Sequence, residues 1–324
     1  MNKFELVKRN TVEIITEKEL LERIDNATGY AGYEPTSRVH IGWLVWIFKV
    51  KDLVDAGVKM KILEATWHGW INDKGSVDEL KECSRNVREV FYKLGINVDF
   101  IDIDSLTNDK EYWRLVIKIA KSSSLARIKR ALSILGRKTE DAELDFSKLI
   151  YPLMQVADSL YLGVDIALGG LDQRKAHMLA RDVAEKLGLK KPIAIHTPVL
   201  TGLSGVGKMT GTGLDVDEAL AIYKMSKSRP GDAIYIDDPP EDIERKILKA
   251  YCPPREVKYN PVLEIAKYLI IPYRGELRVE TQREVLIVRS QEELDQLYSS
   301  GQIHPHDLKR SLIEHVKDFL SIFR

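Results

Sequence analysis

Cysteine is scarce in this chain, and long apolar runs are missing. Its 324 residues include two cysteines, Cys83 and Cys252, which lie far apart and form no CxxC pair. They support neither a disulfide framework nor a zinc knuckle, and both thiols are expected to be reduced and structural. No apolar run approaches the roughly 20 residues that a membrane-spanning helix needs. The charged N-terminal sequence MNKFELVKRN lacks the apolar core of a secretory signal, so a cytoplasmic location is expected.

The chain has no excess of one charge either. Lysine and arginine together number 49, as do aspartate and glutamate. This balance excludes the globally basic surface of a nonspecific nucleic-acid coat, although it leaves room for a local basic patch. Hydrophobic residues make up 44% of the chain and charged residues 30%, which is typical of a soluble globular protein. The length favours two domains, because single domains mostly contain roughly 100 to 200 residues.

Strands and helices alternate through the first two thirds of the sequence. Strands are expected at residues 28–35, 58–65, 98–103, 164–168 and 192–196, and helices at 41–56, 78–94, 110–162 and 173–188. This order predicts an α/β fold, a Rossmann-type parallel sheet with helices on both faces. Ligands of such sheets bind beyond the carboxyl ends of the strands. The residues expected at those ends are Tyr30, Gly32, Ala65, Gly169 and Gly170.

The composition changes after the last expected strand. Residues 200–231 are rich in glycine, serine and threonine, which predicts a mobile lid loop. After the Asp-Asp-Pro-Pro stretch at 237–240, helical patterns follow without further strand and helix repeats. We therefore predict a catalytic domain over residues 1–237, with a helical insert at about 106–162, and a mainly helical domain over residues 238–324.

The sequence His40-Ile41-Gly42 lies at a turn from a strand into a helix. The first N–H groups of a helix and its dipole favour phosphate. There His40 can donate a hydrogen bond to a triphosphate as pyrophosphate leaves, and Gly42 lets a nucleotide approach the backbone. The alternative is a histidine that caps its own helix, and a three-residue match does not decide between the two.

A second motif, KMSKS at residues 224–228, lies within the predicted lid. Its lysines, Lys224 and Lys227, can close over a triphosphate and stabilise its developing charge, and then open to release the product. Basic loops are commonly just solvated. However, the two motifs occur in the order and placement that this chemistry needs, and together they predict an enzyme that activates a small carboxylic acid as an adenylate at the expense of ATP.

These motifs resemble the HIGH and KMSKS signatures of class I aminoacyl-tRNA synthetases. Further segments are similar to the archaeal type of tyrosyl-tRNA synthetase and extend over nearly the whole chain: GYAGYEPTSRVHIG, YPLMQVADSLYLGVDIALGGLDQRKAHMLAR, HTPVLTGL, AYCPP, NPVLEIAKY and HPHDLK. The resemblance implies two steps, in which tyrosine and Mg²⁺-bound ATP give tyrosyl-adenylate, and the tyrosyl group then passes to the 3′ end of tRNA(Tyr). It also implies a homodimer formed through the helical insert. No metal bound by the protein itself is expected.

Tyr30 and Asp158 carry the choice of amino acid. Tyr151, Gln155 and Asp158 are spaced to project from one face of a helix, and Tyr30 alternates with Gly32 on its strand. An aspartate on an apolar helix face is by itself more often exposed or paired structurally. Together with Tyr30, however, it offers a phenol hydroxyl both a donor and an acceptor. Such a site rejects phenylalanine, which would leave these polar groups unpaired.

The resemblance assigns further roles residue by residue. Tyr151, Gln155 and Gln173 would hold the substrate ammonium, His40, Gly42, Lys224 and Lys227 would act in catalysis, and the ATP site would comprise Gly32, His40, Gly170, Asp172, Lys224, Ser226 and Lys227. Arg174 would contact the tRNA, and His304 and Asp307 would belong to the anticodon-reading turn. The basic residues Arg127, Lys129, Arg130, Arg137 and Lys138 either contact RNA or form a solvated face. The aromatic residue that would stack in the anticodon loop is not identified.

Two departures from the family pattern leave alternatives open. Trp43 occupies the fourth position of the first signature, where it cannot replace a second histidine. Lys208-Met209-Thr210 looks like a degenerate second signature, although the five-residue match favours Lys224 as the lid lysine. A noncatalytic RNA-binding relative is therefore an alternative function. Tryptophanyl-tRNA synthetase is another, disfavoured because indole has no use for the Tyr30 and Asp158 pair, and a small-molecule nucleotidyltransferase is disfavoured by the C-terminal domain.

Overall fold

The chain divides into two compact units in the computed structural model, which describes residues 2–132, 145–206, 223–226, 229 and 231–324. The first, called the sheet unit here, comprises Met1–Ser37, Trp46–Thr197 and Asp215–Ile222. The second unit comprises Arg38–Val45, Pro198–Leu214 and Tyr223–Arg324. The domain boundary near residue 238, the extent of the helical insert and the lid at 200–231 stay predictions.

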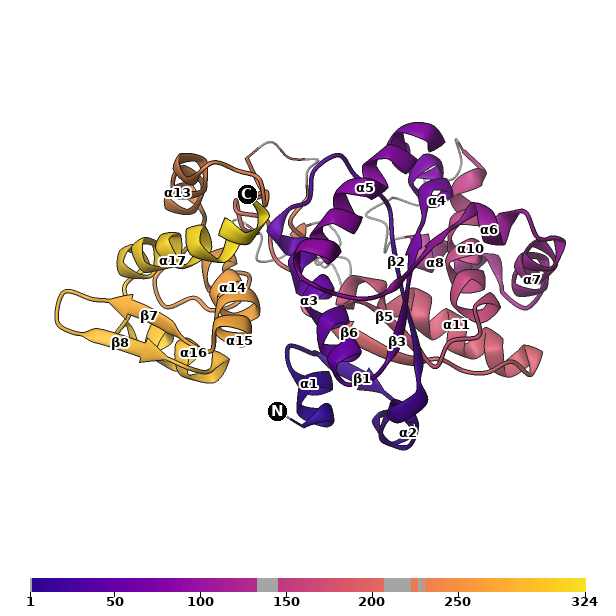
Figure 1. Cartoon of the computed structure of the whole chain (residues 1–324), viewed down its shortest axis with the longest axis horizontal. Helices are drawn as coiled ribbons and strands as arrows, with labels where there is room; N and C mark the ends of the chain where they lie inside the picture. Colours follow the sequence, from indigo (N-terminus) through magenta and orange to yellow (C-terminus); the bar gives the residue numbers. More distant parts are fainter. Residues whose placement is uncertain (1, 133–144, 207–222, 227–228, 230) are drawn as a thin grey trace. The chain divides into compact units, whose positions relative to one another are not determined.

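A six-stranded sheet forms the centre of the sheet unit (Figure 1). Its strand order is β1-β6-β5-β2-β3-β4, and every neighbouring pair is parallel except β1 with β6. The strands are β1 (Glu13–Ile15), β2 (Thr28–Tyr33), β3 (Lys59–Glu64), β4 (Asp99–Asp102), β5 (Ile166–Gly170) and β6 (Ile193–Thr197). The predicted α/β fold is confirmed. β1 was not predicted, because its three residues are too few to show a period and only the edge of β6 selects them.

Helices cover both faces of this sheet (Figure 1). The longer ones are α3 (Ile41–Asp55), α5 (Val77–Lys93), α7 (Lys110–Lys121), α8 (Leu125–Leu132), α10 (Ser147–Tyr161) and α11 (Arg174–Leu187), and the shorter ones are α1 (Lys3–Lys8), α2 (Glu17–Arg23), α4 (Thr66–Ile71) and α6 (Asp104–Thr107). Side chains of α7, α8, α10 and α11 share one buried core with Tyr30, Leu63 and Ala167 of the strands. On the opposite face, Tyr33 of β2 stacks on Trp46 of α3. Among the helices of the described residues, we find no candidate membrane span.

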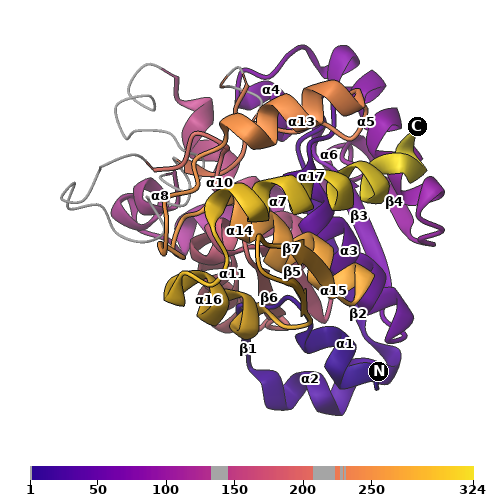
Figure 2. The same cartoon turned by 90° about the vertical axis from the view of Figure 1, so that its left-hand side faces the viewer.

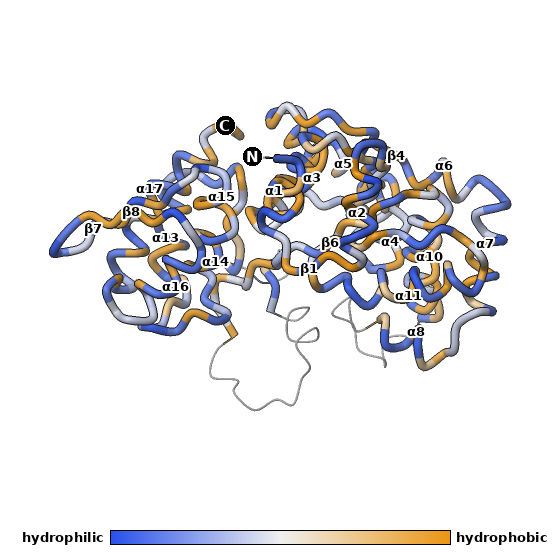
Figure 3. The backbone as a smooth tube through the Cα atoms, turned by 90° about the horizontal axis from the view of Figure 1, so that it is seen from below, coloured by the Kyte–Doolittle hydropathy of each residue, from blue (hydrophilic) through white to orange (hydrophobic). Residues whose placement is uncertain are grey.

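The second unit is mainly helical after residue 238. It contains α13 (Pro240–Lys249), α14 (Pro261–Ile265), α15 (Ile271–Arg274), α16 (Gln291–Ser300) and α17 (Pro305–Leu320), with α13 beside α17 (Figure 2). A hairpin of β7 (Leu277–Glu280) and β8 (Val285–Val288) was not predicted. β8 is a run of hydrophobic residues next to a hydrophilic turn (Figure 3). That turn lacks the glycine that signals a hairpin, and the four-residue strands find their place through contacts with α17.

Candidate active site

A buried carboxylate, Asp158 of α10, is the centre of a polar cluster in the sheet unit. The hydroxyl of Tyr112 on α7 donates to its Oδ1 atom over 2.7 Å, and the hydroxyl of Tyr30 on β2 lies close to the same carboxylate. His68 of α4 places Nε2 3.2 Å from Oδ2, at an angle that makes no hydrogen bond. Tyr30 is the most exposed of the four side chains, at 5%. Four elements thus converge on one charge that is shielded from water.

Both tyrosines at this carboxylate are neutral hydrogen-bond donors. Burial, and then the nearby charge of Asp158, raise the pKa of Tyr30 well above its ordinary value and act in the same direction on the pKa of Tyr112. The sequence predicted that Tyr30 and Asp158 would share a pocket, and the structure brings them together. It did not predict Tyr112 and His68, because these lie on other elements, 46 and 90 residues from Asp158, and no periodicity links them to it.

Gly32 leaves room for this arrangement. A Cβ atom built on Gly32 would lie 2.4 Å from the hydroxyl oxygen of Tyr30. Gly32 is itself exposed at the carboxyl end of β2, where the sequence placed it in the ATP site. The absence of a side chain at Gly32 therefore makes room for the Tyr30 hydroxyl. This role does not depend on a nucleotide approaching the backbone of Gly32.

A second polar cluster surrounds Tyr151, one helical turn before Gln155 on α10. The Tyr151 hydroxyl donates to Glu34 Oε1 over 2.5 Å, and Glu34 also pairs with Lys74 and accepts from Asn72. Burial opposes the charge of Glu34, but Lys74 and the hydrogen bonds outweigh it and lower the pKa of that carboxyl. Glu34 was not among the predicted site residues, although it lies in the GYAGYEP segment. It adds a negative charge beside Tyr151.

Gln155 and Gln173 form a third part of the site, at the carboxyl end of β5. Gln155 Nε2 donates to Gln173 Oε1 over 2.7 Å, and Gln173 Nε2 donates to Asp172 Oδ2 over 3.0 Å. Gly170 precedes the short 3-10 turn Leu171–Gln173, which carries Asp172 and Gln173, whereas Gln155 lies on α10. The structure thus brings together the predicted residues Gln155, Gly170, Asp172 and Gln173.

The two signature motifs lie next to each other in the second unit. His40 is buried, with 8% of its surface exposed, and pairs with Tyr235 in an antiparallel bridge just before α3. A Cβ atom built on Gly42 would lie 2.9 Å from His40 Nδ1 and 3.5 Å from Cβ of Met225. The residue before Met225, Lys224, forms an antiparallel bridge with Thr201. Gly42 therefore permits close packing between the first signature and the second.

Part of the second signature lies outside the described residues. Lys224 and Ser226 are described and partly buried, whereas Lys227 is not, and neither is the alternative lid lysine Lys208. Arg229 donates to the carbonyl oxygen of Lys224 over 3.3 Å. The choice between Lys224 and Lys208 stays open.

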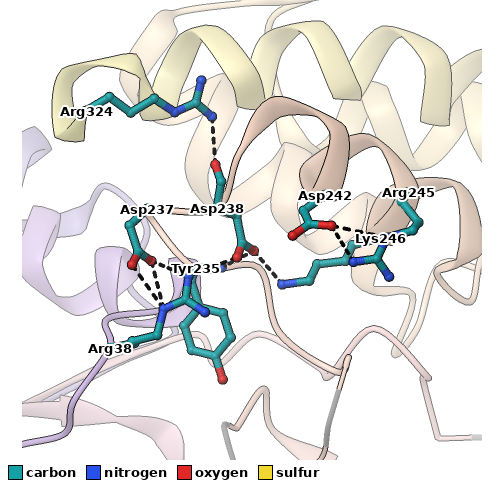
Figure 4. A network of polar contacts seen from close by, with 8 residues as sticks. All are labelled: Arg38, Tyr235, Asp237, Asp238, Asp242, Arg245, Lys246 and Arg324. Carbon is teal, nitrogen blue, oxygen red and sulfur yellow. Dashed lines mark hydrogen bonds and ion pairs between the residues drawn. The ribbon is translucent and has the colours of Figure 1, made fainter.

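A charged network holds the segment that pairs with His40 (Figure 4). Arg38 donates to both Asp237 and Asp238, and its guanidinium lies 4.1 Å from the ring centroid of Tyr235. Lys246 of α13 pairs with Asp238 and approaches the same ring, at 4.9 Å. Because Tyr235 bridges to His40, this network fixes the backbone on which the first signature rests.

The candidate tRNA contacts belong to different units. Arg174 begins α11 and donates through Nε to Glu13 Oε1 over 2.6 Å. His304 caps α17, accepting from the N–H of His306, and Asp307 lies in the first turn of that helix. His304 thus has a local structural role that the sequence did not predict. Among the described residues, no group of three or more His, Cys, Asp or Glu side chains is arranged to hold a metal ion.

Comparisons with known proteins extend over nearly the whole chain. The family model described as tRNA synthetases class I (W and Y) matches residues 24–213 and 218–321. Tyrosine–tRNA ligase 2 of Pyrobaculum aerophilum is 52% identical over 312 residues, 96% of this chain and 97% of that protein. The crystal structure of tyrosyl-tRNA synthetase from Aeropyrum pernix is 49% identical and covers 99% of this chain and 93% of its own, with a TM-score of 0.86. The Archaeoglobus fulgidus enzyme, complexed with L-tyrosine, is 38% identical, with coverage of 99% and 96% and a TM-score of 0.85.

Proposed function

The chain belongs to the class I tRNA synthetases of the tryptophan and tyrosine family, and we propose that it is a tyrosine–tRNA ligase. One observation carries the choice of tyrosine: the buried carboxylate of Asp158, held by the Tyr112 hydroxyl, lies beside the hydroxyl of Tyr30, so an acceptor and a donor for a phenol hydroxyl are side by side. The reaction joins the carboxylate of tyrosine to the α-phosphate of ATP and then to tRNA(Tyr).

The phenol hydroxyl of the substrate is recognised by Tyr30 and Asp158. Asp158 accepts a hydrogen bond from the substrate hydroxyl, and the Tyr30 hydroxyl donates one to the substrate oxygen. Phenylalanine would remove both groups from water and offer neither of them a hydrogen bond, which is why a polar site of this kind discriminates more strongly than an apolar one. Tryptophan is disfavoured as a substrate, because its indole can donate one hydrogen bond but accepts none.

The ammonium group of tyrosine is held by Tyr151, Gln155 and Gln173. Amide and hydroxyl oxygens are acceptors suited to an ammonium donor. Glu34 supports this assignment, since its carboxylate accepts from the Tyr151 hydroxyl and so leaves the lone pairs of that oxygen for the substrate. Gly32, Gly170 and Asp172 contribute to the ATP site, with Asp172 as an acceptor for the ribose hydroxyls.

In the first step an oxygen of the tyrosine carboxylate attacks the α-phosphorus, and the bond to pyrophosphate breaks. His40, Lys224 and Lys227 stabilise the charge that moves onto the leaving pyrophosphate, and Gly42 keeps the space around His40 open. Ser226 adds a hydroxyl donor, and Mg²⁺ enters bound to ATP. In the second step a ribose hydroxyl at the 3′ end of the tRNA attacks the adenylate carbonyl and AMP leaves.

The tRNA is contacted by Arg174 at its acceptor end and by His304 and Asp307 at its anticodon. Asp307 accepts from a base that is splayed out of its stack, as single-stranded RNA recognition usually requires. We further propose a cytoplasmic homodimer formed through the helical insert.

Tyrosine-dependent exchange between pyrophosphate and ATP tests the proposal. We expect exchange with tyrosine in the presence of Mg²⁺ and at elevated temperature, and no exchange with tryptophan or phenylalanine. Loss of exchange in Lys224→Ala, with activity kept in Lys208→Ala, supports Lys224 as the lid lysine. If no amino acid supports exchange, the proposed enzymatic activity is wrong and the chain is a noncatalytic RNA-binding relative. If tryptophan alone supports exchange, only the assignment of the pocket to tyrosine is wrong.

A further inference from the structure

Four side chains in the sheet unit are linked into one hydrogen-bonded ring together with the backbone of α11, and of the four the proposed reaction uses only Arg174. His177 Nδ1 lies 2.9 Å from His196 Nε2, and the two imidazoles stack with their centroids 5.0 Å apart. His196 Nδ1 lies 2.9 Å from Glu13 Oε1, and the same oxygen accepts from Arg174 Nε over 2.6 Å. The ring closes through the backbone, because Arg174 and His177 are three residues apart in the first turn of α11.

The ring ties the start of α11 to three neighbouring strands. Glu13 of β1 lies opposite His196 of β6, and His196 lies opposite Gly169 of β5. A Cβ atom built on Gly169 would lie 3.0 Å from Cε1 of His177, so the absent side chain makes room for the imidazole. His196 is fully buried, whereas the Arg174 side chain is 39% exposed. The ring therefore runs from the sheet interior to an arginine at the surface.

The direction of each hydrogen bond follows from the chemistry of the four groups. Burial, with His196 nearby, lowers the pKa of His177 to about 3, and burial, with Arg174 nearby, lowers the pKa of His196 to about 4. Both imidazoles are thus neutral near pH 7, and each has one donor and one acceptor nitrogen. An ionised carboxylate only accepts, so the Nδ1 atom of His196 carries its proton and its Nε2 atom accepts from Nδ1–H of His177.

This sequence of donors and acceptors holds the side chain of Glu13 in place and, through Glu13, the side chain of Arg174. The bond from His196 holds the Glu13 carboxylate in one orientation, and that carboxylate then holds the guanidinium by Nε. A guanidinium held at Nε keeps its two terminal amino groups for a phosphate or a base edge. Arg174 also directly follows Gln173 of the substrate site. A hydrogen-bonded, charged partner restricts a long side chain that would otherwise lose rotamer freedom only when the ligand binds.

We propose that Glu13 is a positioning residue for aminoacyl transfer: with His196 and His177 it orients Arg174 before the acceptor end of the tRNA arrives. The inference rests on the proposed function, since the orientation of Arg174 matters to the reaction only if this side chain contacts tRNA. The first step, formation of tyrosyl-adenylate, involves no tRNA and so does not need an oriented Arg174.

A double-mutant cycle tests the coupling between Glu13 and Arg174. We expect Glu13→Ala to raise KM for tRNA(Tyr) in aminoacylation by about tenfold, the order of a lost charge-assisted hydrogen bond, and to leave tyrosine-dependent pyrophosphate exchange within about twofold of the unmodified protein. In an Arg174→Ala background the same change is expected to have no further effect on KM. The matched control is Glu185→Ala, which removes an exposed carboxylate on α11 that pairs with Lys191 at 2.7 Å. It should leave both KM for tRNA(Tyr) and the rate of pyrophosphate exchange unchanged.

A spectroscopic measurement reports the protonation of the two histidines independently of enzymatic activity. Nitrogen-15 NMR of the histidine side chains should show His177 and His196 as neutral tautomers protonated at Nδ1 at pH 7, and Glu13→Ala should abolish the Nδ1 preference of His196. The inference is overturned if Glu13→Ala raises KM for tRNA(Tyr) as much in the Arg174→Ala background as in the unmodified protein. It is also overturned if His196 is protonated at Nε2. An unchanged KM in Arg174→Ala also overturns it, while normal pyrophosphate exchange in that variant would leave the proposed ligase activity standing.

Discussion

The hydroxyl of Tyr112 on α7 donates a 2.7 Å hydrogen bond to Oδ1 of Asp158 on α10, and both side chains are buried. This contact joins α7 to the pocket in which we place the tyrosine phenol. A buried polar group is costly unless it is hydrogen-bonded, so Tyr112 helps to hold Asp158 in its orientation. Asp158, which recognises the substrate, therefore depends on Tyr112, which the substrate need not contact.

Replacing Tyr112 with phenylalanine should weaken the selection of tyrosine. The ring and its packing are kept, but Asp158 loses a donor, and a hydrogen bond to a charged group contributes about 1.5–3 kcal/mol. We expect the ratio of kcat/KM for tyrosine to that for phenylalanine to fall by about 10- to 100-fold in pyrophosphate exchange.

Tyr161→Phe is the matched control for that experiment. The Tyr161 ring packs against Tyr112 with centroids 5.6 Å apart, but its hydroxyl donates to Asp109 rather than to Asp158. The discrimination ratio should therefore stay unchanged in this variant. Equal losses in the two variants would mean that packing, and not the hydrogen bond to Asp158, sets the selectivity.

Gly32→Ala should act on tyrosine binding. Its new Cβ atom would lie 2.4 Å from the Tyr30 hydroxyl, so the Tyr30 side chain must shift from its position beside Asp158 or the backbone must yield. We expect KM for tyrosine to rise by at least about tenfold, as for a lost hydrogen bond to a charged group, while KM for ATP changes less. Initial rates of exchange at varied tyrosine and varied ATP measure both. A larger effect on KM for ATP would instead support the ATP-site role predicted for Gly32 from the sequence.

The sequence predicted those parts of the site that short-range periodicity or a motif encodes. Asp158, Gln155 and Tyr151 follow helical spacing on α10, and the alternation in β2 turns Tyr30 to the same face. Tyr112 could not be assigned in this way, because only the packing of α7 on α10 brings it to Asp158.

The elements that were missed have a similar explanation. β1 and the β7–β8 hairpin have three and four residues per strand; β1 pairs with the distant strand β6, and the hairpin packs on α17. Glu13 belongs to the first of these elements. Its place beside His196 depends on the antiparallel register of β1 on β6, which no local pattern reveals.

Gly42→Ala should act on adenylate formation. The Cβ atom would lie 2.9 Å from His40 Nδ1 and 3.0 Å from its Cε1, so the imidazole would have to turn or shift. We expect kcat of pyrophosphate exchange to fall by about 10- to 100-fold, the scale of a misplaced group that stabilises developing charge. Tyrosine affinity, measured by calorimetry without ATP, should stay within about twofold. A loss of tyrosine affinity as large as the loss of kcat would contradict the assignment of Gly42 to the charge-stabilising group.

Acid should destabilise the protein through His177 and His196 before its carboxylates titrate. Both histidines have folded-state pKa values, about 3 and about 4, below the ordinary value of 6.5. Below pH 6.5 the unfolded chain therefore binds protons that the folded chain does not, and the stability present above this pH is lost as the pH falls toward 4. Each histidine contributes a slope of at most about 1.4 kcal/mol per pH unit.

The double variant His177→Gln/His196→Gln isolates this effect, because all other titrating groups are common to both proteins. It should be less stable than the unmodified protein at pH 7, since the stacked pair is lost, but its unfolding free energy should fall by about 1–3 kcal/mol less between pH 7 and pH 5. Urea denaturation followed by circular dichroism at both pH values measures the difference. Parallel losses of stability in the two proteins would show that the buried histidines accept protons in the folded state, and the neutral ring between Glu13 and His177 would then be wrong.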